Sequence, residues 1–146
     1  MTTTTVENNH ALSNCRSQLE SIKELYRNYQ EAESKDDYEA QEKLREQAQE
    51  EALSVEFRSG WTHDLNDMKP EQFKILLSTG GPACQIIGDL NQYQEAMNYS
   101  IEIQYQDWGT PWESLQLNSH YPDNSPNITS DYEALEWFCR CYYFGE

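Results

Sequence analysis

The sequence predicts an α+β fold, with an N-terminal helical hairpin, an antiparallel sheet of about four strands, and a C-terminal helix packed on that sheet. Three observations support this prediction. Apolar residues recur every three or four positions near the N-terminus, which is the pattern of an amphipathic helix. Apolar and polar residues alternate around Ile103, as in a half-buried strand. Ser130 then opens an aromatic-rich segment with a helix-start signature.

The N-terminal third of the chain is expected to be mainly helical. Residues 1–9 (MTTTTVENN) are polar and are predicted to form a flexible tail, followed by a helical hairpin over residues 10–53. The apolar positions of the first helix have a spacing of 3, 4, 3, 4 and 3, which is a heptad seam: Leu12, Cys15, Leu19, Ile22, Tyr26 and Tyr29. This seam either packs on its own domain or joins two copies as a homodimer through the Leu12–Tyr29 helix.

The second helix is predicted to start at Ser34 and to run to about Leu53. Acidic residues follow Ser34 at the positive end of the helix dipole, which stabilises a helix start. The apolar stripe of this helix consists mostly of alanine, so it can bury little apolar surface. We therefore expect a peripheral helix that lies against the first one.

Residues 54–146 are expected to form an acidic α+β domain. Val55 and Phe57 alternate with charged residues and predict a short strand. Residues 73–79 (FKILLST) are apolar enough for a central strand. After a glycine-rich turn, residues 84–90 (CQIIGDL) predict its antiparallel partner.

The clearest predicted strand covers residues 99–106, where apolar and polar side chains alternate strictly. A turn-rich segment from Asp107 to Thr129 follows, and Ser130 with Glu133 then forms the capping box of the last helix. The predicted core residues are Phe73, Ile75, Leu77, Ile86, Tyr99, Ile101, Ile103, Tyr105, Leu135 and Phe138.

Charge is the property that bears most directly on function. The chain has 10 basic and 26 acidic residues and a net charge of -16. Between Lys74 and Arg140 it runs for 65 residues without a lysine or arginine. Such a surface repels nucleic acid and anionic membranes and attracts basic surfaces. We therefore expect a basic nucleic-acid-binding protein or complex as partner, with no direct nucleic-acid binding and no membrane association.

The candidate partner-binding residues are acids of the base-free stretch together with two tryptophans. They are Asp89, Glu95, Glu102, Asp107, Trp108, Trp112, Glu113 and Asp123. The tryptophans bracket a Gly-Thr-Pro turn, and two interpretations of that loop stay open. Its indoles either fill the core or form an exposed aromatic anchor of the kind common at interfaces.

No catalytic residue, metal ligand or cofactor is predicted. The glycine-rich turn at residues 79–83 lacks the lysine typical of a phosphate-binding loop. Cys139 and Cys141 are too closely spaced for a structural zinc site, and His63 with its neighbouring aspartates matches no ligand pattern. Four cysteines without a secretory signal predict reduced thiols and a cytoplasmic location. No apolar run is long enough to cross a membrane.

Four strings in the chain resemble a family of small uncharacterised proteins from phages, plasmids and bacterial genomes. These strings are RSGW at 58–61, ILLSTGGPA at 75–83, YQDWGTPW at 105–112 and YFGE at 143–146. The resemblance covers roughly residues 53–146 and implies no known activity or binding residues. It implies a context, because small acidic proteins of mobile elements are often inhibitors of host defence.

Two functional hypotheses follow. The first is an acidic, non-enzymatic phage protein that occupies the basic nucleic-acid-binding site of a host defence protein by charge mimicry, as an anti-CRISPR or anti-restriction inhibitor would. The second is a small-ligand-binding or enzymatic domain, with a site between the TGGPA turn (79–83) and the DWGTPW loop (107–112). A third interpretation also stays open, in which the acidity serves solubility alone.

Overall fold

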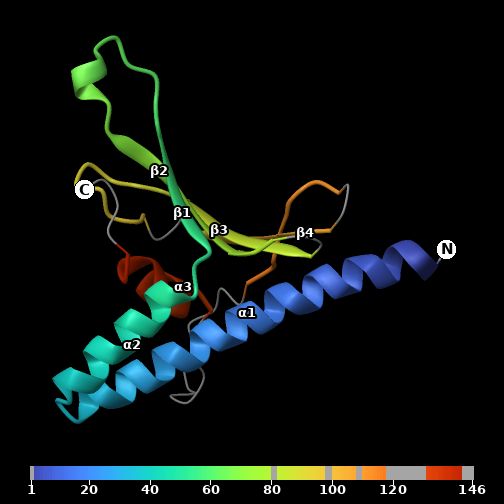
Figure 1. Cartoon of the computed structure of the whole chain (residues 1–146), viewed down its shortest axis with the longest axis horizontal. Helices are drawn as coiled ribbons and strands as arrows, with labels where there is room; N and C mark the ends of the chain where they lie inside the picture. The colour runs from blue at the N-terminus through green and yellow to red at the C-terminus, as the bar shows by residue number, and fades with distance from the viewer. Residues whose placement is uncertain (1, 80–81, 98–99, 108–109, 118–130, 143–146) are drawn as a thin grey trace.

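The α+β class predicted from the sequence is confirmed in the computed structural model (Figure 1). The structure describes residues 2–79, 82–97, 100–107, 110–117 and 131–142, with side chains from residue 10 onward. Two helices, α1 (Thr2–Ser34) and α2 (Tyr38–Glu50), form the hairpin, and α3 (Asp131–Arg140) follows the sheet. No helix in these ranges is long and apolar enough to cross a membrane.

The sheet is an antiparallel meander in which each strand pairs with its neighbours in sequence. Its strands, in spatial order, are β1 (Ser54–Ser59), β2 (Pro70–Ser78), β3 (Ala83–Asp89), β4 (Glu102–Gln106) and β5 (Glu113–Ser114). The sequence predicted about four strands because β5 has only two residues and follows a proline-containing turn. Between β1 and β2, the short 3₁₀ helix η1 (Leu65–Asp67) lies at the tip of an arm that extends away from α1 (Figure 1).

The α1 helix begins at Thr2, well before the start that the apolar spacing predicts. The mobility expected of residues 1–9 stays a prediction. The heptad seam of α1 packs inside its own chain, since Cys15, Leu19, Ile22 and Tyr29 are buried in a cluster with sheet and α3 residues. The homodimer through the Leu12–Tyr29 helix stays a prediction, although four side chains of its seam already pack in the core of their own chain.

The turn between α1 and α2 differs from the prediction that Ser34 opens the second helix. Ser34 is the last residue of α1, and Asp37 is the N-cap of α2, where its carboxylate accepts a hydrogen bond from the Ala40 N–H at 3.1 Å. Asp36 adopts a φ of 53°. The Asp37 N–H donates to the Ala32 carbonyl at 2.9 Å, which completes a Schellman-type end to α1. A left-handed residue thus ends one helix immediately before the next begins.

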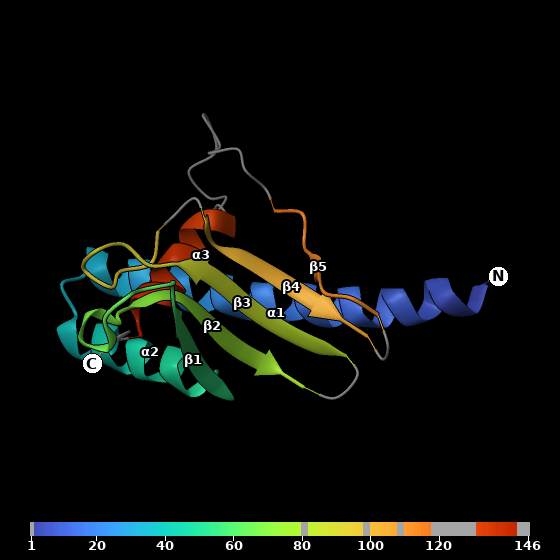
Figure 2. The same ribbon diagram turned by 90° about the horizontal axis from the view of Figure 1, so that it is seen from above.

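One hydrophobic core joins the helices to the sheet. α1 and α3 lie against the same face of the sheet (Figures 1 and 2). Eight predicted core residues are buried, namely Phe73, Ile75, Leu77, Ile86, Ile101, Ile103, Leu135 and Phe138. Tyr105 is only half-buried, because it lies near the end of β4, and Tyr99 falls outside the described residues.

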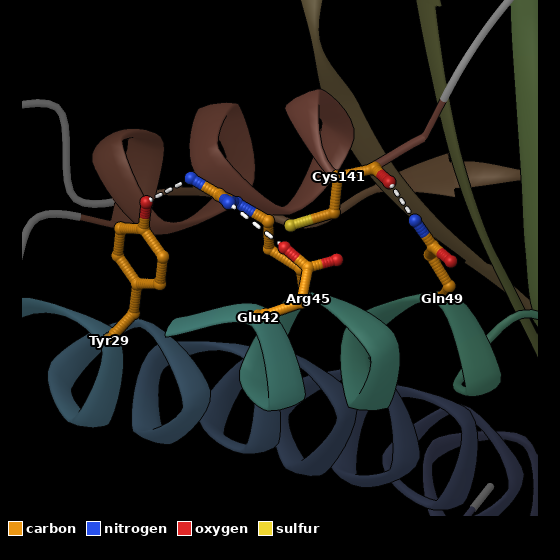
Figure 3. Close-up of polar contacts among 5 residues, drawn as sticks. All are labelled: Tyr29, Glu42, Arg45, Gln49 and Cys141. Atoms are coloured by element: carbon orange, nitrogen blue, oxygen red, sulfur yellow. Dashed lines mark hydrogen bonds and ion pairs between the residues drawn. The ribbon is translucent and has the colours of Figure 1, made fainter. Parts of the chain in front are cut away.

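Hydrogen bonds, rather than apolar area, attach much of α2 to the rest of the molecule. Figure 3 shows Arg45 of α2 between Tyr29 of α1 and Glu42, with its guanidinium donating to the Tyr29 hydroxyl at 2.6 Å. The Gln49 side chain donates to the Cys141 carbonyl at 2.7 Å, and the Tyr142 hydroxyl donates to the Ala48 carbonyl at 2.5 Å. These hydrogen bonds connect α2 to α1 and to the residues that follow α3. They compensate for the small apolar area that the alanine stripe of α2 can bury.

The four cysteines are free and buried. Burial raises the pKa of the Cys141 thiol to about 12 and raises the pKa of Cys139 as well. Because the thiolate is the reactive form, a raised pKa leaves these groups as neutral thiols at pH 8. We expect the native protein to react slowly with a disulfide reagent such as DTNB at pH 8, and all four thiols to react at once in denaturant. Fast modification of the native protein would contradict this burial.

Candidate partner-binding surface

The candidate surface is the face of the sheet opposite the helices, which no described helix covers (Figure 2). Alternate residues of a strand point to opposite faces. In β2 the buried residues Phe73, Ile75 and Leu77 face the core, so Gln72 and Lys74 face the other side. We call this side the open face. Its side chains come from β1 to β4 and are mostly polar.

A hydrogen-bonded row crosses the open face at one end of the sheet. Arg58 of β1 is paired with Gln72 of β2, which is paired in turn with Asp89 of β3. The Arg58 Nε donates to the Gln72 Oε1 at 2.7 Å, and the Gln72 Nε2 donates to the Asp89 Oδ1 at 3.2 Å. Both contacts are cross-strand and fix the direction in which the Asp89 carboxylate points.

A second row runs beside the first and contains both signs of charge. The residues opposite one another are Glu56, Lys74, Ile87 and Glu102, one from each of β1 to β4. The Ser114 hydroxyl of β5 donates a hydrogen bond to the Glu102 carboxylate. The two rows line a hollow of about 800 Å³ on the open face. Its walls combine polar side chains with Phe57, Phe73 and Ile87.

Three of the acids predicted to bind a partner lie at the same end of the sheet. Asp89 ends β3, Glu102 begins β4, and Glu95 lies in the loop between these strands. That loop is held by its own hydrogen bonds: the Asp89 N–H donates to the Ser100 hydroxyl at 2.7 Å, and the Glu95 N–H donates to the Asn91 side chain at 3.0 Å. All three carboxylates are exposed. We call Asp89, Glu95 and Glu102 the acidic triplet.

The other predicted residues do not belong to this group. Asp107 follows the other end of β4, and Glu113 of β5 is opposite Tyr105 near that end. Asp107 and Trp112 are half-buried, while Glu113 is exposed. Burial and the Glu113 carboxylate raise the pKa of the Tyr105 hydroxyl. The predicted residues Trp108 and Asp123 lie outside the described part of the chain, so the two interpretations of the tryptophan loop stay open.

The two loops of the alternative site flank the same end of the sheet. Ala83, at the end of the TGGPA turn, is opposite Gln106, which precedes the DWGTPW loop. Thr110 is hydrogen-bonded to the residues just after β4 and at its end, because its hydroxyl accepts from the Asp107 N–H at 3.0 Å and its carbonyl accepts from the Gln106 side-chain amide at 2.7 Å. The hollow on the open face, however, lies around the other end of β3 and β4.

Among the described residues, the carboxylates of the triplet form no ion pair. The ion pairs among described residues all involve lysines or arginines of α1 and α2 or the turn between them, such as Lys23, Lys35 and Arg45. None of them includes a triplet residue or Glu113. Likewise, the described residues contain no group of three histidine, cysteine or acidic side chains that could hold a metal ion. The triplet therefore presents negative charge that no described lysine or arginine neutralises in an ion pair.

Sequence reasoning missed the part of the open face that β1 and β2 contribute. Glu56, Arg58 and Lys74 lie on it, and all three precede the base-free stretch on which the prediction concentrated. The alternation of apolar and charged residues in β1 was a signal that could have identified two of them. Comparison with known proteins adds no assignment, since the chain matches no protein-family model, no curated protein and no solved structure.

Proposed function

We propose that this chain is an acidic, non-enzymatic binding protein that occupies a basic nucleic-acid-binding site on another protein. The observation that supports the proposal is the acidic triplet, three exposed carboxylates at one sheet end with no ion pair in the described chain. Carboxylates can replace phosphates in contact with lysine and arginine, and arginine can bind them through two parallel hydrogen bonds.

The position of the triplet suits this role. Its residues lie on a sheet end and on a hydrogen-bonded loop, so their backbone is ordered before a partner arrives, which lowers the entropic cost of binding. The net charge of -16 accelerates the encounter with a basic surface at low salt. The resemblance to proteins of phages and plasmids makes a host defence complex in the cytoplasm the proposed target, with inhibition of the anti-CRISPR or anti-restriction type.

The test begins with a pull-down from bacterial lysate at low salt, followed by purification of the captured partner. We expect a nucleic-acid-binding protein whose own nucleic acid displaces the acidic chain, because both compete for one site. Affinity should fall steeply as salt screens the charges. Displacement by salt without competition from nucleic acid would contradict charge mimicry.

Neutralising the triplet should weaken this complex. The double variant Asp89→Asn, Glu102→Gln removes two charges from the triplet, and we expect the dissociation constant to rise roughly tenfold or more, with a shallower salt dependence. The matched control is Glu46→Gln, Glu50→Gln on α2, which removes two exposed charges without an ion pair. Equal weakening in both variants would show that net charge alone acts.

The hollow on the open face supports a second candidate function, the binding of a small ligand. Its volume of about 800 Å³ lies within the range of ligand sites, and Arg58 and Lys74 offer positive charge beside Glu56 and Glu102. A thermal-shift screen with nucleotides, sugars and divalent ions tests it, because a bound ligand raises the melting temperature. A shift that Lys74→Gln abolishes would favour this function over charge mimicry.

A further inference from the structure

The outer edge of β1 is a second candidate binding surface of the molecule. β1 pairs with β2 on one side, and no described strand pairs with its other side, so it lies at one margin of the sheet (Figure 2). An edge strand presents backbone N–H and C=O groups that can hydrogen-bond to a strand of another molecule. The occupant of this edge must match both its charge and its apolar side chains.

The charge around β1 differs from that of the acidic stretch between Lys74 and Arg140. Residues 53–74 are nearly neutral, with three basic and four acidic side chains: Arg58, Lys69, Lys74, Glu56, Asp64, Asp67 and Glu71. The whole chain has a net charge of -16, so two copies repel each other less through this region than through the acidic stretch between Lys74 and Arg140. β1 itself has one charge of each sign, Glu56 and Arg58, on either side of Phe57.

Two large apolar side chains near β1 are also exposed. Leu53 precedes the strand and is 60% exposed, and Trp61 follows it and is fully exposed. They stand four residues before and four residues after Phe57. Exposed apolar groups at matched distances from one point are suited to contact between two copies, because each can cover the other's surface.

We propose that a second copy of this chain adds to the β1 edge as an antiparallel strand, around a two-fold axis at Phe57. In this register Glu56 of each copy lies opposite Arg58 of the other, so two opposite-charge pairs form across the interface. With the backbone extended beyond both ends of β1, the same axis places Leu53 of each copy opposite Trp61 of the other. The two sheets then form one continuous ten-stranded sheet.

The same residues disfavour the neighbouring registers. Moving the axis to position 56 places Glu56 opposite Glu56, and moving it to position 58 places Arg58 opposite Arg58. Like charges directly opposite each other destabilise a strand pair. A shift of one residue between strands instead exchanges the two faces of the added strand. The charge pattern of β1 therefore selects the register centred on Phe57.

Light scattering coupled to size-exclusion chromatography, with sedimentation velocity over a concentration series, tests the proposal. We expect a reversible monomer–dimer equilibrium that strengthens with salt, because screening reduces the repulsion between two chains of equal charge. This dependence is opposite in sign to that of the proposed complex with a basic partner, so the two proposals can fail separately.

Charge-reversal variants identify the register. Arg58→Glu and Glu56→Arg should each raise the dimer dissociation constant about ten- to thirtyfold, since two attractive pairs become repulsive. The double variant Glu56→Arg, Arg58→Glu should restore the wild-type value. Glu56→Arg makes the net charge less negative, which by itself would strengthen the dimer. A weaker dimer in this variant therefore shows that the charge pairs across the strands act, and not the net charge. The control Arg27→Glu has the same net charge as Arg58→Glu and leaves the edge intact.

Two results would overturn the proposal. One is a wild-type protein that stays monomeric at every concentration in about 1 M NaCl, where the Debye length is about 3 Å. The other is an unchanged dimer in both single variants, which would place the interface elsewhere. Circular dichroism of each variant shows whether it is folded, and restoration by the double variant cannot arise from misfolding.

Discussion

Replacement of Phe138 by alanine should lower the free energy of unfolding by about 3–5 kcal/mol, the usual cost of removing a buried phenylalanine ring. Phe138 has no exposed surface and lies in the hydrophobic cluster shared by α1, α3 and the sheet. Its ring also meets the Tyr142 ring edge-on, with the centroids 5.4 Å apart. The variant loses the apolar contacts of the ring and leaves a cavity that its neighbours can fill only in part.

Urea denaturation followed by far-UV circular dichroism measures this loss. The matched control is Leu65→Ala in η1, where the leucine is 82% exposed, and we expect it to change the free energy of unfolding by less than about 0.5 kcal/mol. A loss below about 1 kcal/mol for Phe138→Ala would mean that α3 does not pack on the sheet as described.

Replacement of Lys23 by methionine is the second change with a large expected effect. The Lys23 ammonium lies 2.9 Å from the Asp131 carboxylate, and both side chains are mostly buried, with 16% and 13% exposure. Methionine keeps the aliphatic length but removes the positive charge from beside this carboxylate. Breaking a buried ion pair from one side costs about 3–5 kcal/mol, and we expect about 2–3 kcal/mol here because some solvent reaches the pair.

The double variant Lys23→Met, Asp131→Asn tests whether charge causes the loss. It should be more stable than Lys23→Met alone, because it no longer holds an anion at this site. The control is Lys35→Met, which breaks an exposed ion pair with Glu31 and should cost about 0.5 kcal/mol or less. A double variant no more stable than Lys23→Met would assign the loss to the lysine's aliphatic packing instead.

Periodicity predicted the parts of the fold in which one face of an element is buried. The spacing of Cys15, Leu19 and Ile22 identified the packed face of α1, and alternation identified β4. It could not predict β5, because two residues carry no period. The end of α1 also escaped prediction, since it depends on a left-handed Asp36 that many sequences could tolerate there.

The candidate surface was predictable in its chemistry but not in its grouping. Composition indicated uncompensated acid in the second half of the chain, and the triplet residues are exposed there. Which acids meet depends on strand register, which placed Glu102 opposite Ile87, two residues from Asp89, and Glu113 opposite Tyr105. Register is a long-range property that no local pattern contains.

The contact between α1 and α3 has a consequence for the order of folding. Lys23 and Asp131 are more than a hundred residues apart, yet their ion pair and the surrounding core join the first helix to the last. Closing such a long loop costs chain entropy before any contact compensates for it, so topologies of this kind fold slowly. During synthesis, the part of the apolar face of α1 that packs on α3 therefore stays uncovered until α3 has been made. We infer that the newly made chain is most vulnerable to proteases and aggregation just before its C-terminal helix is completed.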